Sequence, residues 1–105
     1  MPRRGSPTTY VSLTEVRLDL RDSRNLKEKR KVVSSLKAQI RHRFVAAVAE
    51  TDAHDDRRRA VLVCALVGGA ELRERASELE RFVEARCPDR CTFERDLLTL
   101  DDLRA

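Results

Sequence analysis

The spacing of apolar side chains divides the chain into alternating strands and helices. Residues 10–20 alternate apolar and charged side chains, which is typical of a half-buried strand. Residues 60–67 are apolar at every position, which is typical of a strand covered on both faces. Residues 44–50, rich in Val and Ala, and residues 92–100 predict two further strands. We therefore expect one sheet of four strands.

Two amphipathic helices are predicted between these strands. The segment Arg21–Arg43 supplies the first, because Asn25 is a favourable N-cap and Glu28 follows three residues later in a capping-box-like pattern. The predicted apolar stripe of this helix is Leu26, Val32, Val33, Leu36 and Ile40. Residues 70–86 form the second helix, which ends before Pro88 because proline cannot continue a helix.

The order β-α-β-β-α-β predicts the fold. With right-handed crossovers it gives an α+β, ferredoxin-like plait: a four-stranded antiparallel sheet with two helices on one face. At 105 residues the chain has room for one domain, which we place at residues 10–100. Residues 1–9 are expected to form a flexible N-terminal tail, and residues 101–105 a short acidic tail that frays.

Positive charge is concentrated on the first helix. Arg21–Arg43 holds nine Lys or Arg against two acids, a formal charge of +7 in a chain whose total is +4. Cations in a first helical turn oppose the helix dipole, and a bound anion reverses that effect. The sequence therefore predicts an RNA- or anion-binding face, with a solvated basic face as the alternative. Its candidate residues are Arg24, Lys27, Lys29, Arg30, Lys31, Lys37 and Arg41.

Lys29 has two interpretations, because it falls within the apolar stripe. It is either a cation positioned at the first strand–helix turn or the partner of an acid such as Glu50 or Asp52. A lysine on an apolar stripe must be paired or must extend to solvent. We favour the ion pair.

The sheet face without helices is expected to carry an apolar row. Residues 60–67 place apolar side chains on both sides of their strand, and the helices cover only one of them. Exposed apolar rows of this kind are typical of interfaces, so we expect a homo-oligomer formed through the open face. Residues 11–20 and 60–67 contain no aromatic side chain, so RNA would be bound through phosphates and not by stacking on the sheet.

No catalytic, metal or cofactor site is predicted. The spacing of Cys87 and Cys91 differs from that of a zinc knuckle, and an odd count of three cysteines fits a reduced, cytoplasmic protein. Gly68-Gly69 lacks the lysine of a P-loop. The acidic residues of loop 50–56 precede Arg57-Arg58-Arg59, which favours mutual screening over cation binding. No apolar run reaches the length of a membrane span.

Several blocks of the chain resemble the YlxP-like family, small bacterial proteins of unassigned function. They are Leu18-Asp19-Leu20, then Ser23, then Leu26-Lys27-Glu28-Lys29-Arg30-Lys31-Val32-Val33, Leu36-Lys37, Val48-Ala49-Glu50-Thr51-Asp52 and Ala65-Leu66-Val67. The resemblance covers most of residues 10–100. It implies a ferredoxin-like fold and a gene neighbourhood beside translation initiation factor two and ribosome-binding factor A.

That neighbourhood makes ribosomal RNA or a ribosomal subunit the expected polyanion. We therefore expect a non-enzymatic protein that binds RNA or ribosomal particles through its basic first helix. The alternative is a self-associating structural or regulatory module without nucleic-acid binding. An acylphosphatase-like enzyme on this fold would need a glycine-rich loop after the first strand, and residues 21–25 contain no glycine.

Overall fold

Four strands and three helices follow one another along residues 9–105, the part of the chain that the computed structural model describes. In chain order they are β1 (Tyr10–Asp19), α1 (Leu26–Phe44), β2 (Ala47–Asp52), β3 (Arg59–Gly68), α2 (Leu72–Arg86), β4 (Cys91–Thr99) and α3 (Leu100–Arg104). Residues 1–8 of the predicted N-terminal tail lie outside the described residues.

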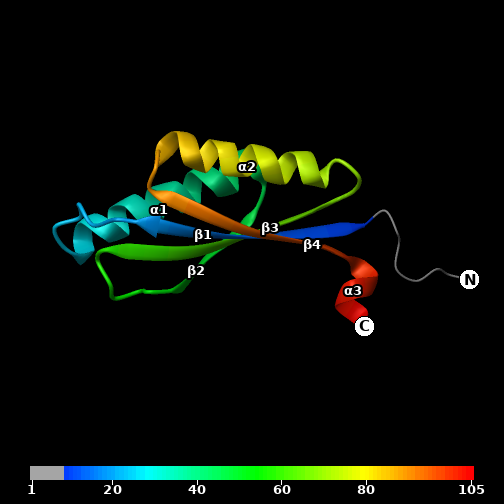
Figure 1. Ribbon diagram of the computed structural model, residues 1–105, viewed down its shortest axis with the longest axis horizontal. Helices are drawn as coiled ribbons and strands as arrows, with labels where there is room; N and C mark the ends of the chain where they lie inside the picture. The colour runs from blue at the N-terminus through cyan, green and yellow to red at the C-terminus, as the bar shows by residue number, and fades with distance from the viewer. Residues whose placement is uncertain (1–8) are drawn as a thin grey trace, which may run out of the picture.

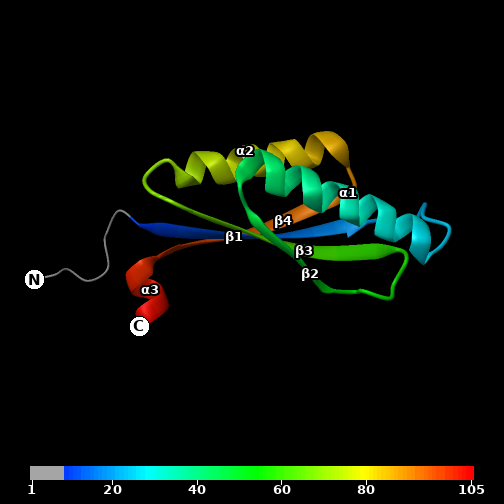
Figure 2. The ribbon, with the colours of Figure 1, turned by 180° about the vertical axis from the view of Figure 1, so that it is seen from behind.

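The strands form one antiparallel sheet in the order β2-β3-β1-β4, so β1 and β3 are central. Figure 1 shows α1 and α2 side by side on one face of this sheet, and Figure 2 shows the same arrangement from behind. The predicted ferredoxin-like plait is confirmed, including the central position of the apolar strand at residues 60–67.

The core lies between the sheet and the two helices. Alternate residues of the central strands, among them Val16 and Leu62, point toward the helices and are fully buried. Each such aliphatic side chain contributes about 1.5–3 kcal/mol by leaving water. The stripe of α1 is Lys29, Val33, Leu36, Ile40 and Phe44. The prediction that Val32 belongs to the stripe is wrong: its side chain is 41% exposed, because Val33 points inward and the neighbouring residue is turned about 100° away from it.

Phe44 ends α1 and does not begin the second strand as predicted. Its ring packs edge-on against Phe82 of α2, with 5.4 Å between the ring centres, and this contact holds the last turn of the helix. Val45 then caps α1 in the left-handed region (φ 52°), and its N–H donates to the Arg41 carbonyl. The following strand starts at Ala47.

The C-terminal residues form α3, where a frayed tail was predicted. Thr99 and Asp102 make a reciprocal capping box that satisfies the first amides of this short helix. No residue of α3 is buried, and Leu103 is half exposed. In Figure 1, α3 lies beyond the sheet on the side away from α1 and α2. None of the helices in residues 9–105 is both long and apolar enough to cross a membrane.

Candidate nucleic-acid interface

The first turn of α1 begins where the sequence predicts. The Asn25 side chain accepts a hydrogen bond from the Glu28 N–H at 2.9 Å, as an N-cap should. The Glu28 carboxylate in turn accepts from the backbone N–H and the guanidinium of Arg24. These bonds, the backbone one first, hold the pKa of Glu28 below its usual value. Arg24 lies at the start of the basic surface, but its charge is already compensated by Glu28.

Lys29 lies inside the protein, with a side chain only 1% exposed. Its Nζ is 3.1 Å from Glu50 Oε2, an ion pair without the alignment of a hydrogen bond, and it donates to the carbonyls of Ala53 and His54. The predicted pairing with Glu50 is confirmed. The inclusion of Lys29 among the RNA-binding residues is therefore corrected: a buried lysine whose ammonium group is held by three acceptors has no access to a phosphate.

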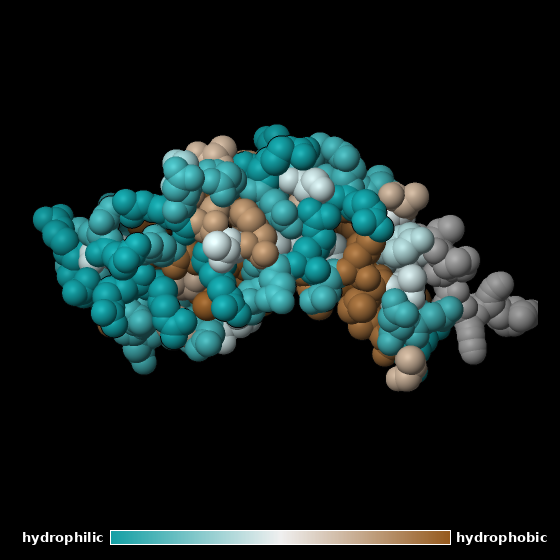
Figure 3. Space-filling model, in the orientation of Figure 1, coloured by the Kyte–Doolittle hydropathy of each residue, from teal (hydrophilic) through white to brown (hydrophobic). Residues whose placement is uncertain are grey.

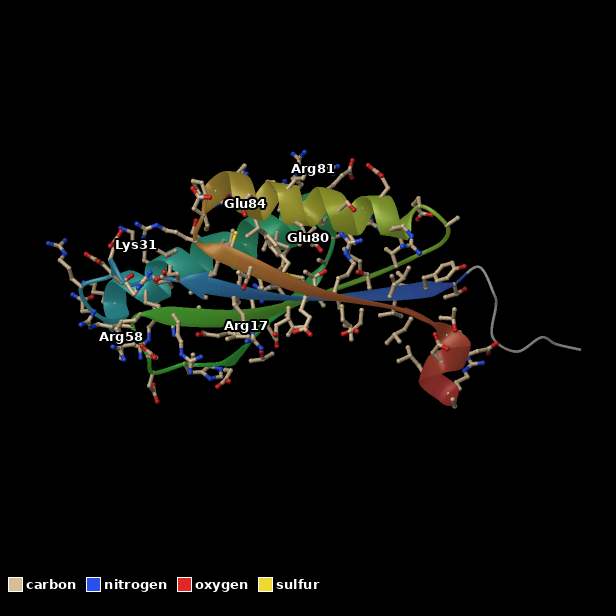
Figure 4. All side chains as sticks on the ribbon, viewed as in Figure 1. Arg17, Lys31, Arg58, Glu80, Arg81 and Glu84 are labelled. Atoms are coloured by element: carbon tan, nitrogen blue, oxygen red, sulfur yellow. The ribbon has the colours of Figure 1, made fainter. Side chains whose placement is uncertain are left out.

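The other predicted cations lie together on the outer side of α1 that faces the β2 edge. Arg41 Nη2 donates to the carbonyl of Val48 in β2, which fixes the direction of this flank. Within residues 9–105 none of these side chains forms an ion pair with a carboxylate. Lys37 is half-buried and the others are exposed. Lys31 is labelled in Figure 4 near the end of the molecule at which α1 begins. We call Lys27, Arg30, Lys31, Lys37 and Arg41 the basic face.

The opposite flank of α1 is occupied by α2. The guanidinium of Arg43 lies 5.3 Å from the centre of the Phe82 ring, and Arg86 donates to Gln39 at 2.6 Å. Cations that pack on aromatic rings stabilise the helix pair and are poorly placed for a ligand. The basic face is therefore the side of α1 that remains open to a partner.

The loop between β2 and β3 is fastened to the start of α1. Arg57 Nη1 donates to the Ser23 carbonyl at 2.9 Å, a contact between residues far apart in the sequence that the sequence gives no means of predicting. Asp56 pairs with both Arg58 and Arg59, as expected for mutual screening. Its pKa is lowered, first by the backbone N–H of Arg58. The loop thus brings arginines to the end of the sheet at which α1 begins, as the label of Arg58 in Figure 4 indicates.

The cysteines carry no chemistry of the kind that a metal site would require. All three are free, and among the described residues no group of three or more His, Cys, Asp or Glu side chains could hold a metal ion. Burial raises the pKa of Cys64 to about 11. Burial, and then a hydrogen bond to Glu84, raise the pKa of Cys91 to about 12. Thiols with such values are protonated at neutral pH and are weak nucleophiles.

The open sheet face divides into an apolar half and a charged half. The strand register aligns Val67, Val11 and Leu98 in one row across three strands, and Ala47, Ala65 and Leu13 in the next, which ends at Asp96 of β4. Further along the strands, the register aligns Val63 with Glu15 and Glu94, and Val61 with Arg17 and Thr92. Val67 is 66% exposed. Figure 3 shows a hydrophobic patch beside α3.

These features define a class of protein: a small ferredoxin-like plait with a basic first helix and an open sheet face that is apolar at one end. The chain matches the model of a family described as "Protein of unknown function (DUF503)" over residues 11–94, and it belongs to that family. The resemblance found in the sequence is thereby confirmed.

The fold is shared with a solved structure. The chain is similar to the protein in the "Crystal structure of protein SO0527 from Shewanella oneidensis", with a TM-score of 0.51 and 12% sequence identity. The similarity covers 91% of this chain and 94% of that one. At this identity the likeness concerns the fold alone. No curated protein matches the sequence.

Proposed function

We propose that this protein binds RNA, without catalysis, through phosphate contacts made by the basic face. The observation that carries the proposal is a cluster of positive side chains that have no carboxylate partner. Five cations lie on one side of one helix, and no carboxylate of residues 9–105 pairs with any of them. Elsewhere on the surface, arginines such as Arg17, Arg21 and Arg95 are paired with acids. The basic face differs from the rest of the surface in gathering five cations without a carboxylate partner on one side of a single helix.

The distribution of charge within α1 supports the same conclusion. The helix contains seven Lys or Arg and one acid, Glu28, which lies off the basic face and pairs with Arg24. The cations from Lys27 to Arg41 extend along roughly 20 Å at about 1.5 Å per residue. That length accommodates several phosphates of one strand. Binding would release the counterions condensed on those phosphates, which favours association at low salt.

The chemistry of the basic face favours binding that tolerates many sequences. Lysine and arginine on phosphates position a strand without reading its bases. Residues 11–19 of β1 and 60–67 of β3 carry no aromatic side chain for stacking on the sheet. The gene neighbourhood implied by the family resemblance makes ribosomal RNA, or a ribosomal particle in the cytoplasm, the partner that we propose.

The test is the salt dependence of RNA binding. Wild-type protein is compared with a variant in which Lys27, Arg30 and Lys31 are changed to Gln. A matched control removes three cations elsewhere, by changing Arg73, Arg81 and Arg104 to Gln. All three control residues are exposed and lie outside α1. If the proposal is correct, the first variant loses affinity and the control does not.

A second function, self-association, is favoured by the open sheet face. The row formed by Val67, Val11 and Leu98 leaves apolar surface in water, and α3 beside it has no buried residue of its own. A second copy of the chain could cover both the apolar row and α3. The acids of the other half, Glu15 and Glu94, would then stay at the rim, because two such groups facing their symmetry mates would repel. Sedimentation velocity tests this proposal.

A further inference from the structure

A pocket of about 540 Å³ opens at the end of the sheet where β1 finishes and β3 and β4 begin. Its volume lies within the range of small-molecule sites. The walls are formed largely by five arginine side chains from three segments that are distant in the sequence: Arg17, Arg21, Arg58, Arg59 and Arg90. Figure 4 labels Arg58 at this end of the molecule and Arg17 further along the sheet, both on the side away from α2. The proposed RNA-binding face does not include this pocket.

The arginines of the pocket are held in place by carboxylates. Arg21 binds Asp19 through two hydrogen bonds, Nε to Oδ1 at 3.0 Å and Nη2 to Oδ2 at 2.7 Å. Arg17 pairs with Glu15 at 2.8 Å, and Arg90 pairs with Asp22. A bidentate pair fixes the plane of the guanidinium as well as its position.

Arg58 and Arg59 share the carboxylate of Asp56, with N–O distances of 3.5 and 3.2 Å. The wall thus holds five guanidiniums and three carboxylates, those of Asp19, Asp56 and Asp89, while Glu15 and Asp22 pair with two of the arginines from outside the wall. The formal charge of the whole group is zero. A bare phosphate gains less from arginines that are already paired with carboxylates than from the basic face of α1, whose cations have no such partner.

Flat aromatic rings suit this lining better than phosphate does. Guanidinium planes stack on nucleobases, and stacking does not require net charge. Carboxylates accept hydrogen bonds from the N–H groups of base edges. Both kinds of group are present here, and the guanidinium plane of Arg21 is oriented by its bidentate pair with Asp19.

Asp89 is the carboxylate of the pocket that is available to a ligand. Among residues 9–105 it takes part in no ion pair, whereas Asp19 and Asp56, the other acids of the wall, are paired. Its backbone is in the left-handed region (φ 59°), and its N–H donates to the Glu84 carboxylate at 3.0 Å. The residue is thus anchored through its backbone while its side chain stays exposed. Two oxygens of a carboxylate match the adjacent N1–H and N2–H donors of guanine.

We propose that this pocket binds a nucleobase, preferably guanine, stacked on arginine planes with its Watson–Crick edge on Asp89. The inference deepens the proposed function, on which its role in RNA binding rests: Arg21 of the pocket and the start of α1 belong to the same connection, so a strand on the basic face can place a base here. The same pocket would also take the base of a free nucleoside.

The test begins with nucleosides, which have no phosphate and so do not engage the basic face. Guanosine, adenosine, cytidine and uridine are titrated into ¹⁵N-labelled protein. Guanosine should shift the backbone amides of residues 89–92 and saturate at the lowest concentration. Changing Asp89 to Asn should weaken guanosine binding about tenfold and leave uridine unchanged. Asparagine tolerates the left-handed backbone, so this variant keeps the fold.

Two further variants complete the experiment. Arg58→Ala should weaken all four nucleosides about tenfold, because it removes a stacking plane. Arg81→Ala, on α2, should change nothing. Equal binding of guanosine and uridine, equal binding by wild type and Asp89→Asn, or shifts confined to α1 would each overturn the proposal.

Oligonucleotides distinguish whether the bound base comes from an RNA strand or from a free nucleoside. If RNA supplies it, Asp89→Asn weakens a guanine-containing strand and not a uridine-only strand. If free nucleosides bind and neither strand is affected, the pocket is a nucleoside site and its role in RNA binding is wrong. Loss of RNA binding in the variant of Lys27, Arg30 and Lys31, with guanosine binding intact, separates the basic face from the pocket.

Discussion

Lys29 Nζ lies 3.1 Å from a carboxylate oxygen of Glu50, and this pair joins the inner side of α1 to the edge strand β2. The same ammonium group donates to two carbonyls of the loop that follows β2. The ion pair is nearly closed to solvent, since the two side chains are 1% and 18% exposed. Lys29 therefore holds the β2–β3 loop against the helix, and it leaves the outer side of α1 to the other cations.

Removing one member of this pair should destabilise the protein strongly. Lys29→Met leaves the largely buried Glu50 charge and two loop carbonyls without their partner, at a cost of about 3 kcal/mol in the free energy of unfolding. Changing both residues, Lys29 to Met and Glu50 to Leu, should recover part of that loss, because the unpaired charge is gone. Urea unfolding of the wild type, both single variants and the double variant measures the coupling. Additive effects would contradict the pairing.

Val45 should be a site where glycine stabilises. A valine in the left-handed region is strained by about 1–2 kcal/mol, and its side chain is 88% exposed, so little packing is lost by removing it. We expect Val45→Gly to raise the free energy of unfolding by about 1 kcal/mol. The matched change Val32→Gly, within α1, should lower it by about the same amount. A destabilised Val45→Gly protein would argue against this cap.

The sequence predicted the strands and the first two helices, and it missed the element boundaries that are set by contacts between residues far apart in the chain. The spacing of apolar residues located all four strands, because each strand buries side chains at regular intervals along the chain. The end of α1 was placed too early because the contact of Phe44 with Phe82 joins residues that local pattern cannot relate. The capping box of Thr99 and Asp102 was readable in the sequence, and a helical C-terminus could have been predicted from it.

For the candidate site, the sequence predicts which residues carry the positive charge, but not how the loops that carry the other arginines are arranged in space. The cations of α1 follow from composition, and the pairing of Lys29 follows from its position on the stripe. The contact of Arg57 with Ser23 and the pocket of arginines depend on how three connections meet in space. The spacing of residues along the chain does not predict that these three connections lie close together.

The thiol of Cys91 should become more reactive when Glu84 loses its charge. The Glu84 carboxylate accepts from the Cys91 thiol at 3.2 Å and, after burial, is the main reason that the pKa of Cys91 rises to about 12. Thiolate is the form that reacts, so a lowered pKa means faster alkylation at mildly alkaline pH. We expect Glu84→Gln to accelerate iodoacetamide modification of Cys91 severalfold at about pH 9. Cys64, which is buried elsewhere in the core, provides the internal control.

Self-association, if it uses the open sheet face, should depend on Val67. Placing a charge in an apolar interface opposes association, so Val67→Glu should convert a concentration-dependent oligomer into a monomer in sedimentation velocity. Val32→Glu adds the same charge on the helix side and should leave the oligomer intact. A wild-type protein that stays monomeric at high micromolar concentration would remove this function from consideration.

The salt dependence of RNA binding tests the central claim most directly. With three to five phosphate contacts, the log–log slope of affinity against salt for single-stranded ribosomal RNA fragments should be about −2 to −3.5. Changing Lys27, Arg30 and Lys31 to Gln should reduce its magnitude by about 2 while thermal stability holds or rises slightly, because cations leave a helix N-terminal turn. The control variant of Arg73, Arg81 and Arg104 should retain the wild-type slope. Equal affinity and equal slope for wild type and the Lys27, Arg30 and Lys31 variant would mean that the basic face is only a solvated surface.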